Sequence, residues 1–206
     1  MGTDFAWHLD AVPERLTDLL DGGEVPSGPA VDLGCGDGVV AAHLAERMHP
    51  TIGLDLAFGA AHQGQHRAAV ARAAASFGVS DAAALPLRDR SVALVFDRGC
   101  LQNMPRGDWP AYFAEVQRVL LPDGVLLLFC SRAVKAPIAP LASRRGIKAR
   151  LKWALGRRAG PQFASVEAIR ELTPPSLHVE RLGEAPMRTR FGNERLEIQG
   201  TFRRAR

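Results

Sequence analysis

The sequence predicts an α/β protein with a Rossmann-like, doubly wound sheet, mostly parallel, that closes with an antiparallel C-terminal pair of strands. Three observations support this fold class. Short apolar runs alternate with helical segments as far as Cys130, which is typical of a parallel sheet covered by helices on both faces. A turn containing Gly34, Gly36 and Gly38 follows the first apolar run. Asp55 ends the second run about 20 residues later, as in nucleoside-binding half-sheets.

The individual elements follow from apolar periodicity and from residues that end helices. A first helix is predicted over Phe5–Leu20. Further helices are predicted over Val39–Ala45, Ala57–Phe77 (ended by Gly78), Asp108–Leu120 and Val166–Leu172. Five strands are expected to run parallel, over Ala30–Leu33, Thr51–Leu54, Val79–Ala83, Ser91–Phe96 and Val125–Cys130. Two more strands, Leu177–Leu182 and Leu196–Phe202, are expected to form the antiparallel pair.

Composition is that of one globular domain over residues 1–206, with 47% hydrophobic and 23% charged residues. No run approaches the ~18 apolar residues of a membrane span. Residues 1–10 contain no Lys or Arg and no apolar core of signal-peptide type, so we expect a cytoplasmic protein. The three cysteines are widely separated, which suggests neither a disulfide framework nor a zinc site, and no metal is expected.

The glycine turn distinguishes between nucleosides. A dinucleotide site requires Gly-x-Gly-x-x-Gly, but the third position of that pattern is Val39. Two acids, Asp32 and Asp37, flank the turn. They would repel a pyrophosphate and suit a ligand with an ammonium and a sulfonium group, which indicates S-adenosylmethionine. A glycine turn without any ligand is the alternative, and Asp55 argues against it.

The ends of the third and fourth predicted strands supply further candidates, because ligands bind beyond the carboxyl ends of strands in such sheets. Asp81 could accept a hydrogen bond from an adenine amino group, and the Ala82 amide could donate to a ring nitrogen. Asp97 and Arg98 follow the fourth strand. The alternatives are a plain turn acid at Asp81 and a structural ion pair at Asp97 and Arg98.

Together these segments resemble the class I S-adenosylmethionine-dependent methyltransferases. The motifs are Val31–Gly38, Gly53–Leu56, Asp81–Pro86 and Arg118–Gly124, and Phe96–Leu101 is similar to the thiopurine and tellurite-resistance branch. The resemblance implies that the turn binds the methionine moiety, that Asp55 binds the ribose and that Asp97 borders the methyl group. The expected cofactor-binding residues are Asp32, Gly34, Cys35, Gly36, Asp37, Gly38, Asp55, Leu56, Asp81, Ala82 and Asp97.

Methyl transfer from a sulfonium is an in-line displacement, for which the protein mainly supplies alignment and exclusion of water. No histidine follows the fourth or fifth strand, where a general base is expected. An acceptor that ionises readily, a thiol or a phenol-like group, is therefore favoured. The candidate catalytic residues are Asp97, Arg98 and Cys100, although Cys100 also fits a small buried apolar role. The candidate substrate residues are Phe5, Trp7, Arg98, Gln102 and Trp153.

Two segments, one at the N-terminus and one an insertion, could surround the substrate. Residues 1–25 would form a cap helix, and residues 132–165 a basic lid that attracts an anionic small molecule. Seven Lys and Arg lie between Arg144 and Arg158 without an acid; a solvated helix face, nucleic-acid contact and membrane attachment are the alternatives. Asp97–Cys100 lacks the Asn/Asp-Pro-Pro-aromatic pattern of base methylation, which argues against RNA. RNA methylation and a non-catalytic binding module stay open as alternatives. The oligomeric state is not predicted.

Overall fold

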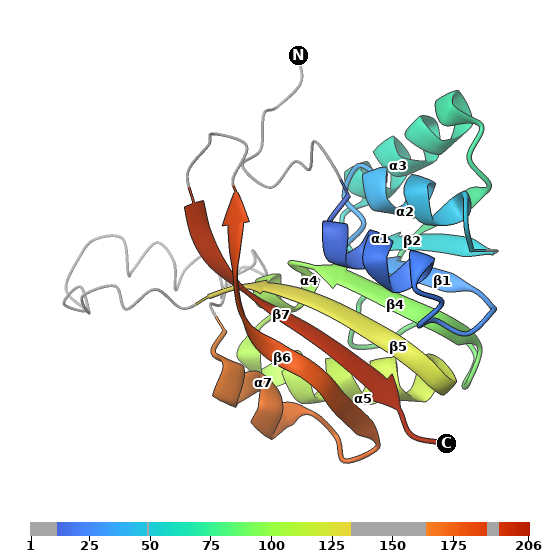
Figure 1. The fold of residues 1–206 in the computed structure, drawn as a ribbon. Coiled ribbons are helices and arrows are strands. Elements are labelled where there is room, and N and C mark those ends of the chain that lie inside the picture. Colours follow the sequence, from blue (N-terminus) through green and yellow to red (C-terminus); the bar gives the residue numbers. More distant parts are fainter. Residues whose placement is uncertain (1–11, 49, 133–163, 189–193) are drawn as a thin grey trace, which may run out of the picture.

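The computed structural model describes residues 12–48, 50–132, 164–188 and 194–206. Within them, seven strands form one sheet in the order β3-β2-β1-β4-β5-β7-β6 (Figure 1). The strands β1 to β5 are mutually parallel, β7 is antiparallel to β5, and β6 is antiparallel to β7. This arrangement confirms the predicted fold class. The strands are β1 (Ala30–Leu33), β2 (Thr51–Asp55), β3 (Ala75–Val79), β4 (Val92–Arg98), β5 (Leu120–Ser131), β6 (Leu177–Arg188) and β7 (Glu194–Arg204).

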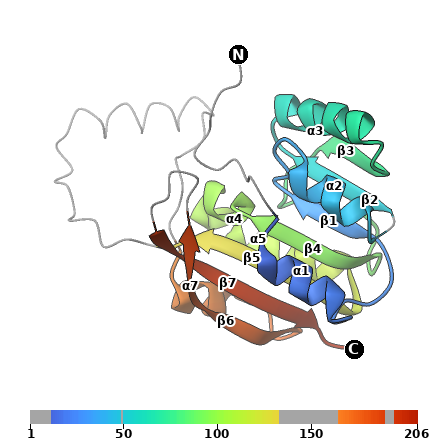
Figure 2. The ribbon, with the colours of Figure 1, turned by 45° about the horizontal axis from the view of Figure 1, so that its top comes forward.

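Helices cover both faces of the sheet (Figures 1 and 2). The first face carries α1 (Glu14–Asp21), α2 (Val39–Ala45) and α3 (Phe58–Ala71). The second carries α5 (Trp109–Val119) and α7 (Val166–Leu172). A single helical turn, α4 (Cys100–Asn103), follows β4, and a short 3₁₀ turn, η1 (Arg106–Asp108), precedes α5.

The central strands alternate their side chains between the two faces, as the pleat of a strand requires. In β5, Val125, Leu127 and Phe129 pack with α1 and α2. Leu126 and Leu128 of the same strand pack instead with α5 and α7. All five side chains are buried, which accounts for the continuous apolar run in the sequence.

The third strand lies elsewhere than predicted. The expected helix Ala57–Phe77 ends early, because Arg72 adopts a left-handed conformation (φ 53°). The chain then forms β3 over Ala75–Val79, paired with β2, so the predicted strand Val79–Ala83 is wrong. Alanines favour a helix in isolation, but burial of Ala75 and pairing with β2 override that preference.

Two other boundaries differ from the prediction. The first helix begins at Glu14, with Val12 and Pro13 outside it, since proline lacks the N–H needed in a helix interior. The expected residues Phe5–Ala11 of that helix lie outside the described residues. The strand β5 begins at Leu120, where a turn was predicted over Pro122–Gly124. That segment is an irregularity within the β4–β5 pairing.

Candidate functional site

A cavity of about 640 Å³ opens at the carboxyl ends of the parallel strands. Its walls come from the turn after β1, the end of β2, the loop after β3 and the segment from β4 into α4. This is the edge at which ligands bind in open α/β sheets. The cavity brings together most of the predicted site: Asp32, Gly34, Cys35, Gly36, Asp37, Asp55, Leu56, Asp81, Ala82, Arg98, Cys100 and Gln102.

The three glycines of the first turn have different tasks, although all adopt left-handed conformations. A Cβ on Gly34 would lie 2.9 Å from the Cys100 Cβ, so this glycine lets the β1 and β4 segments approach. A Cβ on Gly36 would meet nothing within 4 Å, and Gly36 lines the cavity. Gly38 is buried and outside the cavity wall. Its Cβ would lie 2.8 Å from Gly64 and Phe77, so its place is in helix packing.

Asp55 joins the end of β2 to the glycine turn. The Gly36 N–H donates to Asp55 Oδ2 (3.1 Å), and the Ala57 N–H donates to Asp55 Oδ1 (2.8 Å). Each carboxylate oxygen can accept a second hydrogen bond. Because Asp55 is only partly buried and lines the cavity, this remaining capacity is available to hydroxyl groups of a ligand.

The two acids beside the turn have different environments. The pKa of the buried Asp32 is raised to about 8, mainly by burial and also by the charges of Asp97, Asp55 and Asp37, while a hydrogen bond from the Ala41 N–H acts in the opposite direction. The Asp37 carboxylate instead pairs with Arg67 of α3 at 2.6 Å. The cavity floor at Asp32 therefore disfavours further negative charge and would be stabilised by a cation.

The loop after β3 forms a compact turn around Asp81. The Asp81 carboxylate accepts from the Ala83 N–H at 3.0 Å, and the exposed Asp81 forms an isolated bridge with Ala84. Ala82 is buried and lines the cavity beside it. Both predicted residues therefore lie at the cavity, even though the predicted strand before them is misplaced.

Asp97 lies beneath the cavity and does not line it. Its side chain is buried and accepts from the Cys100 N–H (2.7 Å), the Leu101 N–H (3.0 Å) and the Tyr112 hydroxyl (2.7 Å). Burial raises its pKa to about 6, while these hydrogen bonds act in the opposite direction. Asp97 is absent from the cavity wall because the side chains of β4 alternate between the two faces of the sheet. Asp97 and Val95 point to the face that α5 covers.

The remaining candidates, Arg98 of β4 and Gln102 of α4, contact residues of neighbouring strands. Arg98 lines the cavity, lies 3.7 Å from Glu197 of β7 and sits over the Phe129 ring at 5.7 Å. Burial lowers the pKa of Arg98 and raises that of Glu197, and in each case the partner's charge opposes the shift. The Gln102 side chain accepts a hydrogen bond from the Ser131 N–H.

Three contacts of the predicted site residues were missed by the sequence reasoning. Tyr112, Glu197 and Arg67 bond to predicted site residues from elements distant in sequence. The buried position of Tyr112 on the apolar face of α5 was the available signal for its role. The expected substrate residues Phe5, Trp7 and Trp153 and the basic segment Arg144–Arg158 lie outside the described residues. Among the described helices, none has the length and apolar character of a membrane span.

Comparison with known proteins agrees with this geometry. A family model described as a methyltransferase domain matches residues 30–124. A malonyl-[acyl-carrier protein] O-methyltransferase from Geobacter sulfurreducens is 36% identical over 119 residues, which are 55% of this chain and 42% of that protein. A protein of the same name from a Methylovorus species is 30% identical over 123 residues, 56% of this chain and 41% of its own. The chain thus matches less than half the length of either relative.

Solved structures share the fold. One concerns the conversion of a disulfide bond into a thioacetal group during echinomycin biosynthesis; it has a TM-score of 0.74, 24% identity, and coverage of 97% of this chain and 84% of that one. TehB from Haemophilus influenzae has a TM-score of 0.70 and 12% identity, with coverage of 96% and 64%. The fold resemblance that the sequence motifs indicated is confirmed.

Proposed function

We propose that this chain, whose residues 30–124 match the family model of a methyltransferase domain, transfers a methyl group from S-adenosylmethionine to a small molecule. One observation carries the proposal. A single cavity presents an open glycine turn at Gly36, a carboxylate with spare capacity at Asp55 and a buried acid at Asp32.

The cavity fits this cofactor on its own chemistry. The space beyond Gly36 leaves room for a ligand against the backbone. Asp55 would accept from the ribose hydroxyls, and the apolar Leu56 and Ala82 would contact the adenine. The ammonium and sulfonium charges would stabilise the ionised form of Asp32, which burial and the charges of Asp55 and Asp37 disfavour in the free protein. A pyrophosphate would have the opposite effect.

When bound, S-adenosylmethionine supplies an activated methyl group. The residues of this chain then contribute alignment and exclusion of water. Asp97 is assigned a positioning role, because it holds the first N–H groups of α4, and α4 presents Cys100 and Gln102 to the cavity. Arg98 would provide positive charge beside the acceptor.

The acceptor is a group that ionises without a dedicated base, namely a thiol or a phenol-like hydroxyl. No histidine lines the cavity among the described residues. Of the thiols there, Cys35 has a pKa raised by burial and by the nearby acids, so it does not serve as a base. A carboxylate acceptor meets the same requirement, since it is already ionised at neutral pH. The names of the two relatives favour it as the second candidate.

A screen of thiol, phenol, carboxylate, amine and RNA acceptors with labelled cofactor tests the proposal. We expect methylation of a thiol or a phenol, with a rate that rises with pH toward the ionisation of the acceptor. A pH-independent rate would favour the carboxylate. Labelling of RNA alone, suppressed by salt, would overturn the small-molecule assignment. Absence of cofactor binding in calorimetry would indicate a non-catalytic binding module.

A further inference from the structure

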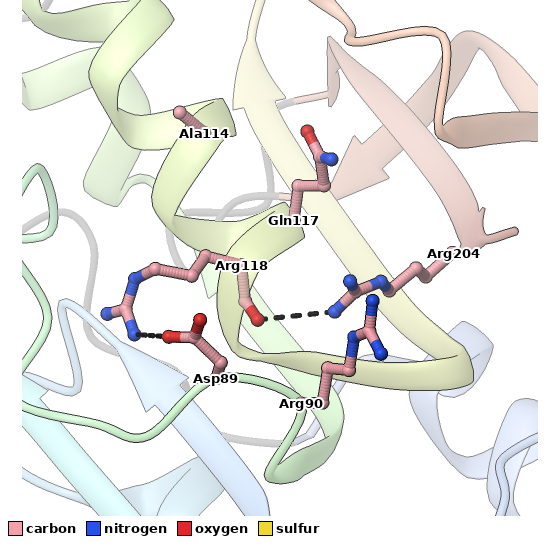
Figure 3. A pocket seen from close by; sticks show the side chains of 6 residues that line it. All are labelled: Asp89, Arg90, Ala114, Gln117, Arg118 and Arg204. Atoms are coloured by element: carbon pink, nitrogen blue, oxygen red, sulfur yellow. Dashed lines mark hydrogen bonds and ion pairs between the residues drawn. The ribbon is translucent and has the colours of Figure 1, made fainter. Parts of the chain in front are cut away.

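A second cavity, of about 470 Å³, lies near the amino end of β4, away from the carboxyl ends that line the first cavity (Figure 3). Arg90 precedes β4, Arg118 lies in the last turn of α5 and Arg204 ends β7. Asp89, Ala114 and Gln117 complete the lining. The strand β4 separates this cavity from the proposed cofactor site, and its seven residues span about 20 Å.

Two of the three arginines are already held by the protein. The Arg118 guanidinium donates to Asp89 (2.7 Å), to Glu115 (2.7 and 2.8 Å) and to the Leu85 and Leu87 carbonyls. Arg204 donates to the carbonyls of Arg118 (3.2 Å) and Leu120. The carboxylate of Asp89 is thus occupied by Arg118, although it remains part of the cavity wall.

Arg90 differs from both. Its guanidinium makes no hydrogen bond or ion pair with the described residues, and its backbone N–H donates to the Arg118 carbonyl at 2.9 Å. Its φ of 49° lies in the left-handed region, which is uncommon for a residue with a side chain. The backbone bond therefore fixes Arg90 at the cavity, while the donors of its side chain remain unused.

The guanidinium groups of Arg90 and Arg204 lie close together in Figure 3, whereas the Gln117 amide points away from them. The pKa of Arg204 is lowered first by burial and then by the charge of Arg90. Among the described residues, no carboxylate bridges the two guanidinium groups. An anion between them would remove the repulsion and use the free donors.

We propose that Arg90 and Arg204 bind the phosphate group of a soluble small molecule at a site separate from the cofactor cavity. Guanidinium groups present paired donors that match the geometry of a phosphate. The backbone bonds of Arg204 hold its guanidinium in place before a ligand arrives. A ligand here would not compete with the cofactor.

Calorimetry with inorganic phosphate, at ionic strength matched with chloride, tests this site on the full chain. We expect the parent to bind phosphate and Arg90→Gln to bind it about tenfold more weakly, as for the loss of a charged hydrogen-bond donor. Arg88→Gln is the matched control, because Arg88 is exposed in the same loop and outside the cavity. Asp89→Asn should tighten binding by removing the carboxylate from the wall.

Three outcomes would overturn the proposal: no heat of phosphate binding in the parent, equal binding by Arg90→Gln, or equal loss in Arg88→Gln. Binding of single-stranded RNA without binding of inorganic phosphate would likewise replace the metabolite site with a nucleic-acid surface. Titration with S-adenosylhomocysteine is the internal control. Arg90→Gln should bind it as the parent does, which separates a local effect from misfolding.

Discussion

The two carboxylates near the ends of β2 and β4 have opposite surroundings. Asp55 is partly buried, lines the cavity and receives one backbone hydrogen bond on each oxygen. Asp97 is fully buried and receives two backbone N–H groups and the Tyr112 hydroxyl. Asp55 therefore has capacity left for a ligand in the cavity, whereas Asp97 lies outside the cavity wall and is bonded to the protein.

The same difference extends to the walls around them. The wall from β1 and β2 offers open space at Gly36 and a partly free carboxylate at Asp55. In the wall from β4, Arg98 is near Glu197 and Gln102 accepts a bond from Ser131. We infer that the first wall receives the cofactor and that the second keeps the shape of the acceptor region.

The largest expected effect is that of Asp55→Ala on cofactor binding. The substitution removes the ribose acceptor and the bond that holds the turn at Gly36, so we expect a loss of about 2–3 kcal/mol, or about 30–150-fold in Kd for S-adenosylhomocysteine. Calorimetry measures this loss. Asp18→Ala, at an exposed position of α1, is the matched control. An Asp55→Ala protein with the affinity of the parent would contradict the role of the β2 end.

Two of the three glycines of the turn, Gly36 and Gly38, should separate cofactor binding from stability. A methyl group at Gly36 would project into free space at the cavity, so Gly36→Ala should weaken cofactor binding at a small cost in stability. At Gly38 the Cβ would meet Gly64 and Phe77 at 2.8 Å. Gly38→Ala should therefore lower the free energy of unfolding by about 1–3 kcal/mol.

Urea unfolding and calorimetry on both glycine variants check this separation. Both substitutions carry the strain of a left-handed residue, so they serve as controls for each other. If Gly36→Ala destabilised the fold as much as Gly38→Ala and bound the cofactor normally, the assignment of Gly36 to the ligand would fail.

The sequence predicted the first wall better than the second, for a physical reason. Gly34, Gly36 and Asp55 belong to one strand-turn-helix-strand unit, whose spacing is local. The orientation of Asp97 depends on which face of the sheet α5 covers, and that is a long-range property. The alternation of Val95, Phe96 and Asp97 indicates that Asp97 and Val95 share one face. Because the rest of the strand is apolar on both faces, the sequence does not show which helices cover that face.

Other differences also come from long-range packing. The strand β3 lies in an alanine-rich stretch whose local preference is helical, and only pairing with β2 identifies it as a strand. Glu197 reaches Arg98 because β7 pairs with β5. The sequence between them contains no spacing that would indicate this contact.

Tyr112→Phe, which removes one hydroxyl group, tests the second wall, and we expect its effect to be smaller than that of Asp55→Ala. Tyr112→Phe deletes the bond to Asp97 between two buried side chains, and should lower the free energy of unfolding by about 2 kcal/mol. The pKa of Asp97 should rise above about 6, because a hydrogen bond that lowers it is lost. A purely structural role would leave the pH dependence of kcat unchanged, whereas a positioning role moves its acidic limb to higher pH.

Phe113→Leu is a suitable control for that variant, since Phe113 is buried beside Tyr112 without a bond to Asp97. It should lower stability and leave the pH profile in place. A Tyr112→Phe enzyme with the kcat profile of the parent would show that Asp97 does not position α4.

A further expected effect is a fall of stability with rising pH, which the raised pKa of Asp32 on the first wall would cause. Burial raises its pKa from 3.8 to about 8, so between these values the folded state keeps a proton that the unfolded chain has lost. Stability should therefore fall as pH rises toward 8, by at most about 1.4 kcal/mol per pH unit, and level off above it. Between pH 7 and 8 Asp97 is mostly ionised already, so the slope measured there by urea unfolding comes mainly from Asp32. Asp32→Asn should remove this part of the slope, whereas Asp18→Asn should keep it; identical slopes in Asp32→Asn and the parent would mean that Asp32 is charged in the free protein.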